Sequence, residues 1–308
     1  MLRVVRLPDA AAEPAPVSLD TGHALDDCIR REGWLVFMPN VDVWGMPLPL
    51  GERPFKIAAQ THVVAIGADP RTVWLHGHNS PTIFEYDGVA REVRQEIELP
   101  GPQFSVTALT ASGFLLHNDH TALYEWEPPQ EPRLLLDDIG PSTADGANRR
   151  LACLRYATDE LVVLDLGDRS HLTVPQPEEA RWALRPGVFS PDGKWLAADL
   201  DYSPERTEEE ALATLTQIAL GDAPPYEPEP HQLGIIRCSD GTMTIADGVY
   251  DNFAKIAWSL DSEWIVFSTP FAPRGLWLTR PDAPKLEWIS FGRRHAPSLL
   301  CDASDLLS

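Results

Sequence analysis

Histidine side chains recur at equivalent places in this sequence. Four of the nine histidines lie in two short polar segments: His76 and His117 are 41 residues apart, and His78 and His120 lie close beside them. Neutral imidazoles bind first-row metal ions such as zinc, and they exchange protons near neutral pH. The pattern therefore makes these four histidines candidate ligands of a divalent metal ion, which is the one cofactor that the sequence suggests.

Carboxylates and an arginine lie in similar polar segments. A carboxylate or a guanidinium beside imidazoles can take part in acid–base chemistry or bind a charged ligand. We therefore predict a binding site composed of His76, His78, His117, Asp119, His120, Asp201 and Arg274. The sequence assigns no catalytic residue, because it contains no His-Glu-x-x-His motif, nucleophile elbow, phosphate loop or dinucleotide fingerprint.

A repeat of about 40 residues supplies the scaffold for these side chains. Short apolar segments follow one another at intervals of 40 residues, centred on Trp44, Phe84, Tyr124 and Leu164. Removing an apparent 28-residue insert at Ser203–Pro230 from the 308 residues leaves 280, which is seven times 40. A period of this length with several short strands in each unit is typical of a β-propeller with four strands in each blade.

The sequence therefore predicts an all-β fold, a seven-bladed β-propeller that forms a single domain over residues 1–308. Its blades would contain strands a to d, and both termini would close the ring: RVVRLPD and APVSLD as strands c and d, SLLCDASDLLS as strands a and b. The first strand of blade four would fall in the polar segment STADGANRR. Six blades with loose termini is the alternative. Propellers bind ligands mostly where the b–c and d–a connections converge, which is where the predicted site residues fall.

Two later segments align residue for residue. Phe189, Ser190 and Asp192 of GVFSPDGKWLAADL match Trp258, Ser259 and Asp261 of KIAWSLDSEWIVFST. The first segment resembles the repeat of TolB-type and WD-like propellers, in which strands a and b turn through Ser-Pro-Asp-Gly. The resemblance implies the propeller fold and says almost nothing about function, because this repeat serves many unrelated tasks.

The insert at 203–230 has its own pattern. Thr207 and Glu210 are spaced as a helix-capping box, and an apolar stripe at helical spacing follows up to Gly221. The next segment, APPYEPEP, is too rich in proline for a helix and predicts an extended arm. We expect a helical, proline-rich insert within blade five. It either packs on the flank of the propeller or covers the loops as a lid or docking arm.

Charge and cysteine usage exclude several classes of function. The 25 basic and 46 acidic residues give a net charge of −21, which repels a phosphate backbone and argues against nucleic-acid binding. No apolar run has the roughly 20 residues that a membrane span needs, and the first residues lack a secretory signal. The four cysteines form no Cys-x-x-Cys pair, which favours a reduced, cytoplasmic protein.

These observations lead to one preferred function and one alternative. The preferred function is a soluble propeller that acts as a protein-interaction or ligand-recognition module through its loops. Its acidity favours a partner protein with a basic surface or a cationic small ligand. The alternative is a metal-assisted hydrolase or lyase that uses the histidines and aspartates. Whether the protein is an enzyme is left open at this stage.

Overall fold

The computed structural model describes most of the chain. The described residues are 3–5, 12–14, 27–38, 41–49, 52–78, 80–118, 121–145, 149–182, 187–203, 230–251, 255–259, 261–268 and 276–289. These residues form β-strands, turns and short loops. Within them, no helix is long and apolar enough to cross a membrane.

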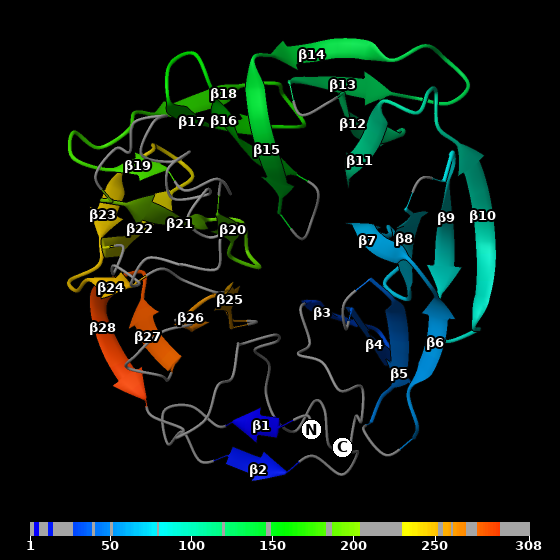
Figure 1. Ribbon diagram of the computed structural model, residues 1–308, viewed down its shortest axis with the longest axis horizontal. Helices are drawn as coiled ribbons and strands as arrows, with labels where there is room; N and C mark the ends of the chain where they lie inside the picture. The colour runs from blue at the N-terminus through cyan, green and yellow to red at the C-terminus, as the bar shows by residue number, and fades with distance from the viewer. Residues whose placement is uncertain are drawn as a thin grey trace, which may run out of the picture.

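The strands form six large antiparallel sheets arranged around a central axis (Figure 1). Each sheet corresponds to one predicted blade, so we keep the numbers one to six. Blade one contains β3 (Asp27–Arg31), β4 (Trp34–Met38), β5 (Val43–Pro47) and β6 (Phe55–Ala58). Blade two contains β7 (Thr61–Ile66), β8 (Thr72–Gly77), β9 (Thr82–Asp87) and β10 (Glu92–Glu98). Blade three contains β11 (Phe104–Leu109), β12 (Phe114–Asn118), β13 (Ala122–Trp126) and β14 (Arg133–Asp137).

The second half of the ring continues in the same order. Blade five differs because its first strand is split into two and its last strand is followed by a short extra strand. Blade four contains β15 (Ile139–Ala144), β16 (Arg150–Arg155), β17 (Glu160–Asp165) and β18 (His171–Val174). Blade five contains β19 (Arg181–Trp182), β20 (Val188–Phe189), β21 (Trp195–Asp201), β22 (Pro230–Arg237), β23 (Met243–Ile245) and β24 (Tyr250–Asp251). Blade six contains β25 (Lys255–Trp258), β26 (Ile265–Ser268), β27 (Leu276–Arg280) and β28 (Ala283–Ile289).

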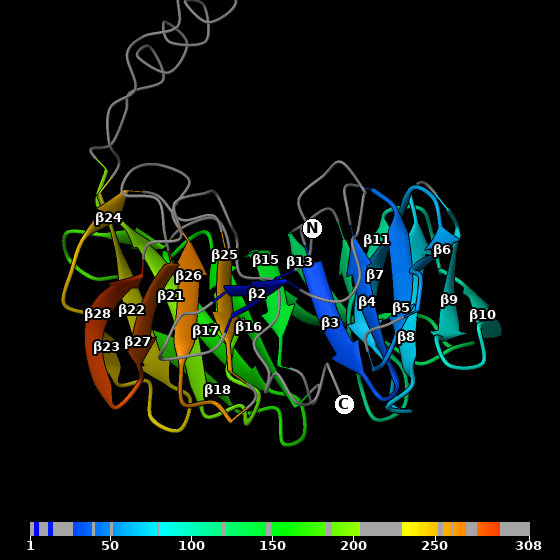
Figure 2. The ribbon, with the colours of Figure 1, turned by 90° about the horizontal axis from the view of Figure 1, so that it is seen from below.

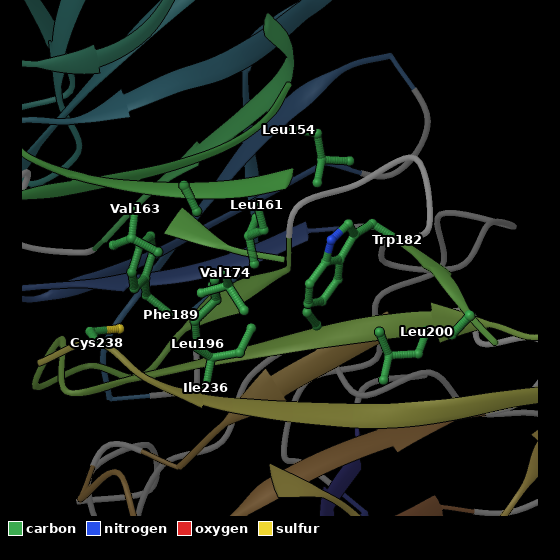
Figure 3. Close-up of a cluster of buried hydrophobic side chains, with 13 residues drawn as sticks. Leu154, Leu161, Val163, Val174, Trp182, Phe189, Leu196, Leu200, Ile236 and Cys238 are labelled. Carbon is green, nitrogen blue, oxygen red and sulfur yellow. The ribbon is translucent and has the colours of Figure 1, made fainter. Parts of the chain in front are cut away.

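The core of the molecule lies between neighbouring sheets. The second strands carry continuous apolar runs because both faces of each sheet are covered by the next sheet. Figure 3 shows one such layer, in which Leu161 and Val163 of blade four pack against Leu196 and Ile236 of blade five. Each buried side chain of this kind stabilises the fold by roughly 1.5–3 kcal/mol relative to an exposed one. The ring is therefore held together blade by blade.

Register shifts interrupt strands at repeated positions. The first strands β7, β11 and β15 each gain one residue relative to the strand beside them. The outermost strands β6, β10 and β14 also gain one residue relative to their neighbours. Such bulges increase the local twist and change which side of the sheet the following side chains face.

The Ser-Pro-Asp-Gly segment forms the turn that its resemblance implied. The hydroxyl of Ser190 donates to Asp192 and accepts a hydrogen bond from the backbone N–H of Trp195. The aligned segment repeats this arrangement, with Ser259 bound to Asp261 and to the N–H of Trp264. The equivalence of these two segments is thereby confirmed.

The termini and blade four refine the predicted strand positions. The first strand of blade four is Ile139–Ala144, which begins earlier than the polar segment where it was predicted. At the N-terminus, β1 (Arg3–Val5) pairs with β2 (Ala12–Pro14), and this pair lies between blades six and one in Figure 1. The strand expected at APVSLD, the strands expected at SLLCDASDLLS and the helix expected in the insert lie outside the described residues. The count of seven blades therefore stays a prediction.

Candidate functional site

The connections between strands define two faces of the ring. The d–a and b–c connections lie on one face, which we call the loop face, and the a–b and c–d connections lie on the other, the turn face. This follows from the antiparallel order within each sheet. The loop face is at the top of Figure 2, where β24 is labelled. His76, His78 and Asp201 lie on the loop face, as predicted. Asp119, His120 and Arg274 lie outside the described residues.

His76 belongs to a group of three histidines on blade two. It lies directly opposite His62 across the β7–β8 pair, and the centres of the two rings are 5.5 Å apart. Nε2 of His76 lies 2.8 Å from the carbonyl oxygen of Ser80, so Nε2 carries the proton and donates this bond. Burial, and then the proximity of His76 and His78, lowers the pKa of His62. His62 was not among the residues predicted from the sequence, and its position opposite His76 in the β7–β8 register identifies it.

His117 does not join this group. It is buried, and its Nε2 lies 2.6 Å from the hydroxyl of Ser142 on the first strand of blade four. The structure therefore brings His76 and His78 together, while His117 contacts the next blade. Within the described residues, no set of three or more His, Cys, Asp or Glu side chains is arranged to hold a metal ion. The predicted metal site that includes His120 is not tested by this observation.

Blade five contains a buried polar network at the loop face that the sequence analysis did not identify. Asp199, which is 2% exposed, accepts hydrogen bonds from Nδ1 of His231 at 2.8 Å and from the hydroxyl of Tyr250 at 2.9 Å. Burial raises the pKa of Asp199, and its contact with His231 opposes this shift. Burial also raises the pKa of Tyr250 well above its usual value. The one signal for this network in the sequence is that Asp199 and His231 lie on the two strands that flank the insert, because these strands pair with each other.

Asp201 connects this network to the surface. One of its carboxylate oxygens is 3.9 Å from Nε2 of His231, and the other accepts a hydrogen bond from Arg181 at 3.2 Å. Asp201 also accepts the backbone N–H of Ser203 at 2.7 Å. Burial raises the pKa of Asp201, but the bonds from Ser203 and then the charges of His231 and Arg181 outweigh it, so the pKa is lowered. Asp201 is therefore a half-buried carboxylate held between one cation and one imidazole.

An acidic region covers the loop face from blade three to blade five. Tyr156, in the b–c connection of blade four, is 53% exposed, and its N–H donates to the carbonyl of Asp138. Within the described part of the chain, the five exposed acids of this region form no ion pair. We call them, with Tyr156, the acidic sector: Asp137, Asp138, Asp159, Glu178 and Glu179.

On the turn face, many acidic side chains form ion pairs with arginine or lysine. Arg94 binds both Asp69 and Asp87, and Arg71 also binds Asp69. Further ion pairs on this face are Arg91–Glu52, Arg133–Glu125, Arg169–Glu125, Lys194–Asp192, Arg237–Asp240 and Arg280–Glu263. Several acids on the turn face are thus paired with basic side chains, while Glu32, Glu127, Glu131 and Asp168 are exposed there with no ion pair in the described residues.

Comparison with solved structures identifies the architecture. The chain is similar to hydrazine synthase of Kuenenia stuttgartiensis, with a TM-score of 0.57, 12% identity and coverage of 86% of this chain and 79% of that chain. It is also similar to Hsv2 of Kluyveromyces lactis, with a TM-score of 0.55, 9% identity and coverage of 88% and 85%. Both neighbours are β-propeller proteins. The chain is a β-propeller.

A third similar chain belongs to a crystal structure of the Mitotic Checkpoint Complex. Its TM-score is 0.51 at 12% identity, and the match covers 98% of this propeller and 92% of that chain. No protein-family model matches the sequence, and no curated protein matches it. Identities this low show the fold alone, so the neighbours support a propeller and not the TolB type in particular.

Proposed function

We propose that this propeller is a recognition module that binds a basic segment of a partner protein through the acidic sector of its loop face. The observation that carries this proposal is the grouping of five exposed acids in adjoining connections of the loop face, from blade three to blade five, with no ion pair in the described part of the chain. Unpaired acids on a rigid surface attract cations and steer basic partners into contact.

Tyr156 adds an anchor to this charged surface. Tyrosine is enriched at protein interfaces because it contributes a large contact area and one hydroxyl at a low entropic cost. Its backbone is fixed by Asp138, and Asp138 also accepts the N–H of Ala157 at 2.9 Å. The exposed ring is therefore presented from a well-ordered turn. The chain from the Mitotic Checkpoint Complex, which is an assembly, fits the use of a propeller as an interaction module at this general level.

A lysine-rich peptide provides a direct test. We would measure the binding of a fluorescein-labelled nonalysine peptide by anisotropy, at low and at physiological ionic strength. The test variant reverses three sector charges: Asp159→Lys, Glu178→Lys and Glu179→Lys. Because each substitution replaces attraction with repulsion, we expect a loss of affinity of about tenfold or more at low salt. The Tyr156→Ala variant should also bind more weakly, although its charge is unchanged.

A control variant with the same net charge distinguishes a specific binding site from an effect of the overall negative charge. Glu92, Glu127 and Glu131 are exposed in or beside the c–d connections of blades two and three, on the turn face. Reversing these three to lysine changes the net charge by the same amount as the test variant, and we expect peptide binding to change by no more than about twofold. Equal losses in the two triple variants would show that only net charge matters, and the proposed function would then be wrong.

A further inference from the structure

The His62–His76 pair has the arrangement of two metal ligands. The two residues are directly opposite each other on neighbouring antiparallel strands, so their side chains lie on the same side of blade two. A zinc–nitrogen bond of about 2.1 Å places each imidazole centre about 3.2 Å from the ion, and two such rings then lie about 5–6 Å apart. The observed separation of the ring centres is 5.5 Å. One ion therefore fits between the two rings at the spacing that the folded strands already impose.

The hydrogen bond of His76 prepares one of its nitrogens for this role. A carbonyl oxygen only accepts hydrogen bonds, so the contact with Ser80 places the proton on Nε2. Nδ1 then carries a lone pair, and it is buried without a hydrogen-bond partner among the described residues. Histidines that bind metals usually donate their other ring N–H to a carbonyl or carboxylate, which fixes the tautomer and the ring orientation. His76 has this arrangement.

We propose that His62 and His76 bind one divalent first-row transition-metal ion, such as Zn²⁺, Ni²⁺ or Cu²⁺, at the loop face of blade two. Imidazole nitrogen is a good ligand for these ions and a poor one for Ca²⁺ or Mg²⁺. Two protein ligands leave the remaining coordination positions to water or to donor atoms of a bound molecule. This site is independent of the acidic sector. It differs from the predicted one because it retains only His76 of the four predicted ligands and adds His62.

The charge state of the pair is compatible with metal binding. Burial and the neighbouring His76 and His78 lower the pKa of His62, so its imidazole is neutral and able to coordinate at pH 7. Around the pair, the backbone N–H of His78 donates to the carbonyl of Gln60, and Asp42 accepts from Gln60 while it is paired with Lys56. The charge of Asp42 is therefore already balanced by Lys56.

Calorimetry with Zn²⁺ on the full-length, chelator-treated protein tests the site. We expect a binding event of one ion per chain in the wild type, and a loss of affinity of about 10- to 100-fold in both His62→Ala and His76→Ala. The matched control is His171→Ala, which removes an exposed histidine from the outer strand of blade four. It should leave the affinity unchanged. Wild-type affinity in either site variant, or an equal loss in the control, would overturn the proposal.

A second measurement guards against variants that fail to fold. Cu²⁺ bound to the wild-type protein should give an electron paramagnetic resonance spectrum with hyperfine splitting from two imidazole nitrogens. The milder variants His62→Gln and His76→Gln should each reduce this to one nitrogen, and their circular dichroism spectra report folding. A wild-type spectrum with no nitrogen splitting would contradict the site. Because the nonalysine experiment contains no metal, its failure would leave the metal site standing, and the reverse also holds.

Discussion

The two faces of the ring hold their most buried carboxylates in opposite ways. Asp87, at the turn face, is fully buried and accepts the backbone N–H groups of Val89 and Ala90 as well as the guanidinium of Arg94. Burial works to raise the pKa of Asp87, but these bonds together lower it. Asp199, at the loop face, has two donors from the side chains of His231 and Tyr250, and burial raises its pKa.

The fold stabilises the ionised form of Asp87 well and the ionised form of Asp199 less well. Backbone N–H groups and arginines favour the ionised carboxylate, so Asp87 closes a turn at little electrostatic cost. For Asp199, the solvation free energy lost on burial exceeds the stabilisation from its two side-chain hydrogen bonds. Groups held in this way are concentrated at functional sites, where structure is arranged for binding and not for stability alone. The two carboxylates therefore respond to pH in opposite directions, although both are buried.

The largest expected loss of stability concerns the contact between blades one and two at the turn face. Trp34 is fully buried, and its indole N–H donates to the carbonyl of Arg71 in blade two at 2.8 Å. Trp34→Ala should lower the free energy of unfolding by about 3–5 kcal/mol, because it leaves a large cavity and an unpaired carbonyl. Urea denaturation followed by circular dichroism measures this.

A pair of milder variants sharpens the same comparison. Trp182, near the loop face, is also buried, but its indole N–H has no hydrogen-bond partner among the described residues. Trp34→Phe should therefore cost more stability than Trp182→Phe, by about 1 kcal/mol, which is the usual contribution of one hydrogen bond. Equal costs would show that the bond to Arg71 contributes nothing to the joining of blades one and two.

The second prediction concerns Asp87 and pH. A carboxyl whose pKa is lowered by folding adds stability above its unfolded pKa of about 3.9, and this stability is lost as the pH falls through the folded pKa. Asp87→Asn should cost about 1–3 kcal/mol at pH 7. The difference between wild type and variant should persist down to about pH 4 and shrink below it. Urea titrations at several pH values measure it, and a difference that did not shrink in acid would contradict this account.

Asp199 should show the opposite slope and a smaller effect. A carboxyl whose pKa is raised by folding adds stability below its unfolded pKa, and this stability is lost as the pH rises through the folded pKa. Wild type should therefore lose stability relative to Asp199→Asn between about pH 4 and pH 7, by about 1 kcal/mol. Melting temperatures of the two proteins across this range provide the measurement. Parallel pH profiles for the Asp87 and Asp199 variants would remove the proposed difference between the faces.

Exposed ion pairs on the turn face should matter least. Arg280 and Glu263 are 2.8 Å apart, but both side chains are partly exposed to solvent. Arg280→Ala should change the free energy of unfolding by less than about 1 kcal/mol, because solvent and salt screen such pairs. Thermal melts at low and high salt would detect it. A larger loss that persisted in high salt would point instead to the packing of Arg280 on Trp264, whose ring centre lies 5.0 Å from the guanidinium.

Much of the fold could be predicted because it depends on local and periodic signals. The interval of 40 residues places a third strand in each blade, and strands centred on Phe84, Tyr124 and Leu164 are present as β9, β13 and β17. The position of β15 was less well predicted because Gly140, Pro141 and Ser142 carry little hydrophobic pattern. That strand is defined by its pairing with β16, and pairing is a property of the fold and not of a segment.

The site was harder to predict than the fold. Sequence spacing correctly placed His76 on the loop face, but it does not report which blade a ring contacts. His117 occupies the equivalent step and contacts Ser142, whereas His76 contacts His62. The Asp199–His231 bond joins residues 32 positions apart, across the whole insert. Such contacts depend on register and bulges, which a single sequence does not specify.

The register shifts in the outermost strands have a consequence for the rim of the molecule. An open sheet edge presents unpaired backbone groups on which another chain can add a strand, and bulges blunt such edges. Because β6, β10 and β14 each carry an extra residue, blades one to three present an irregular rim to solvent. Neighbouring molecules in a crowded solution therefore find no straight template there for fibre growth. This half of the rim can face solvent without a covering helix.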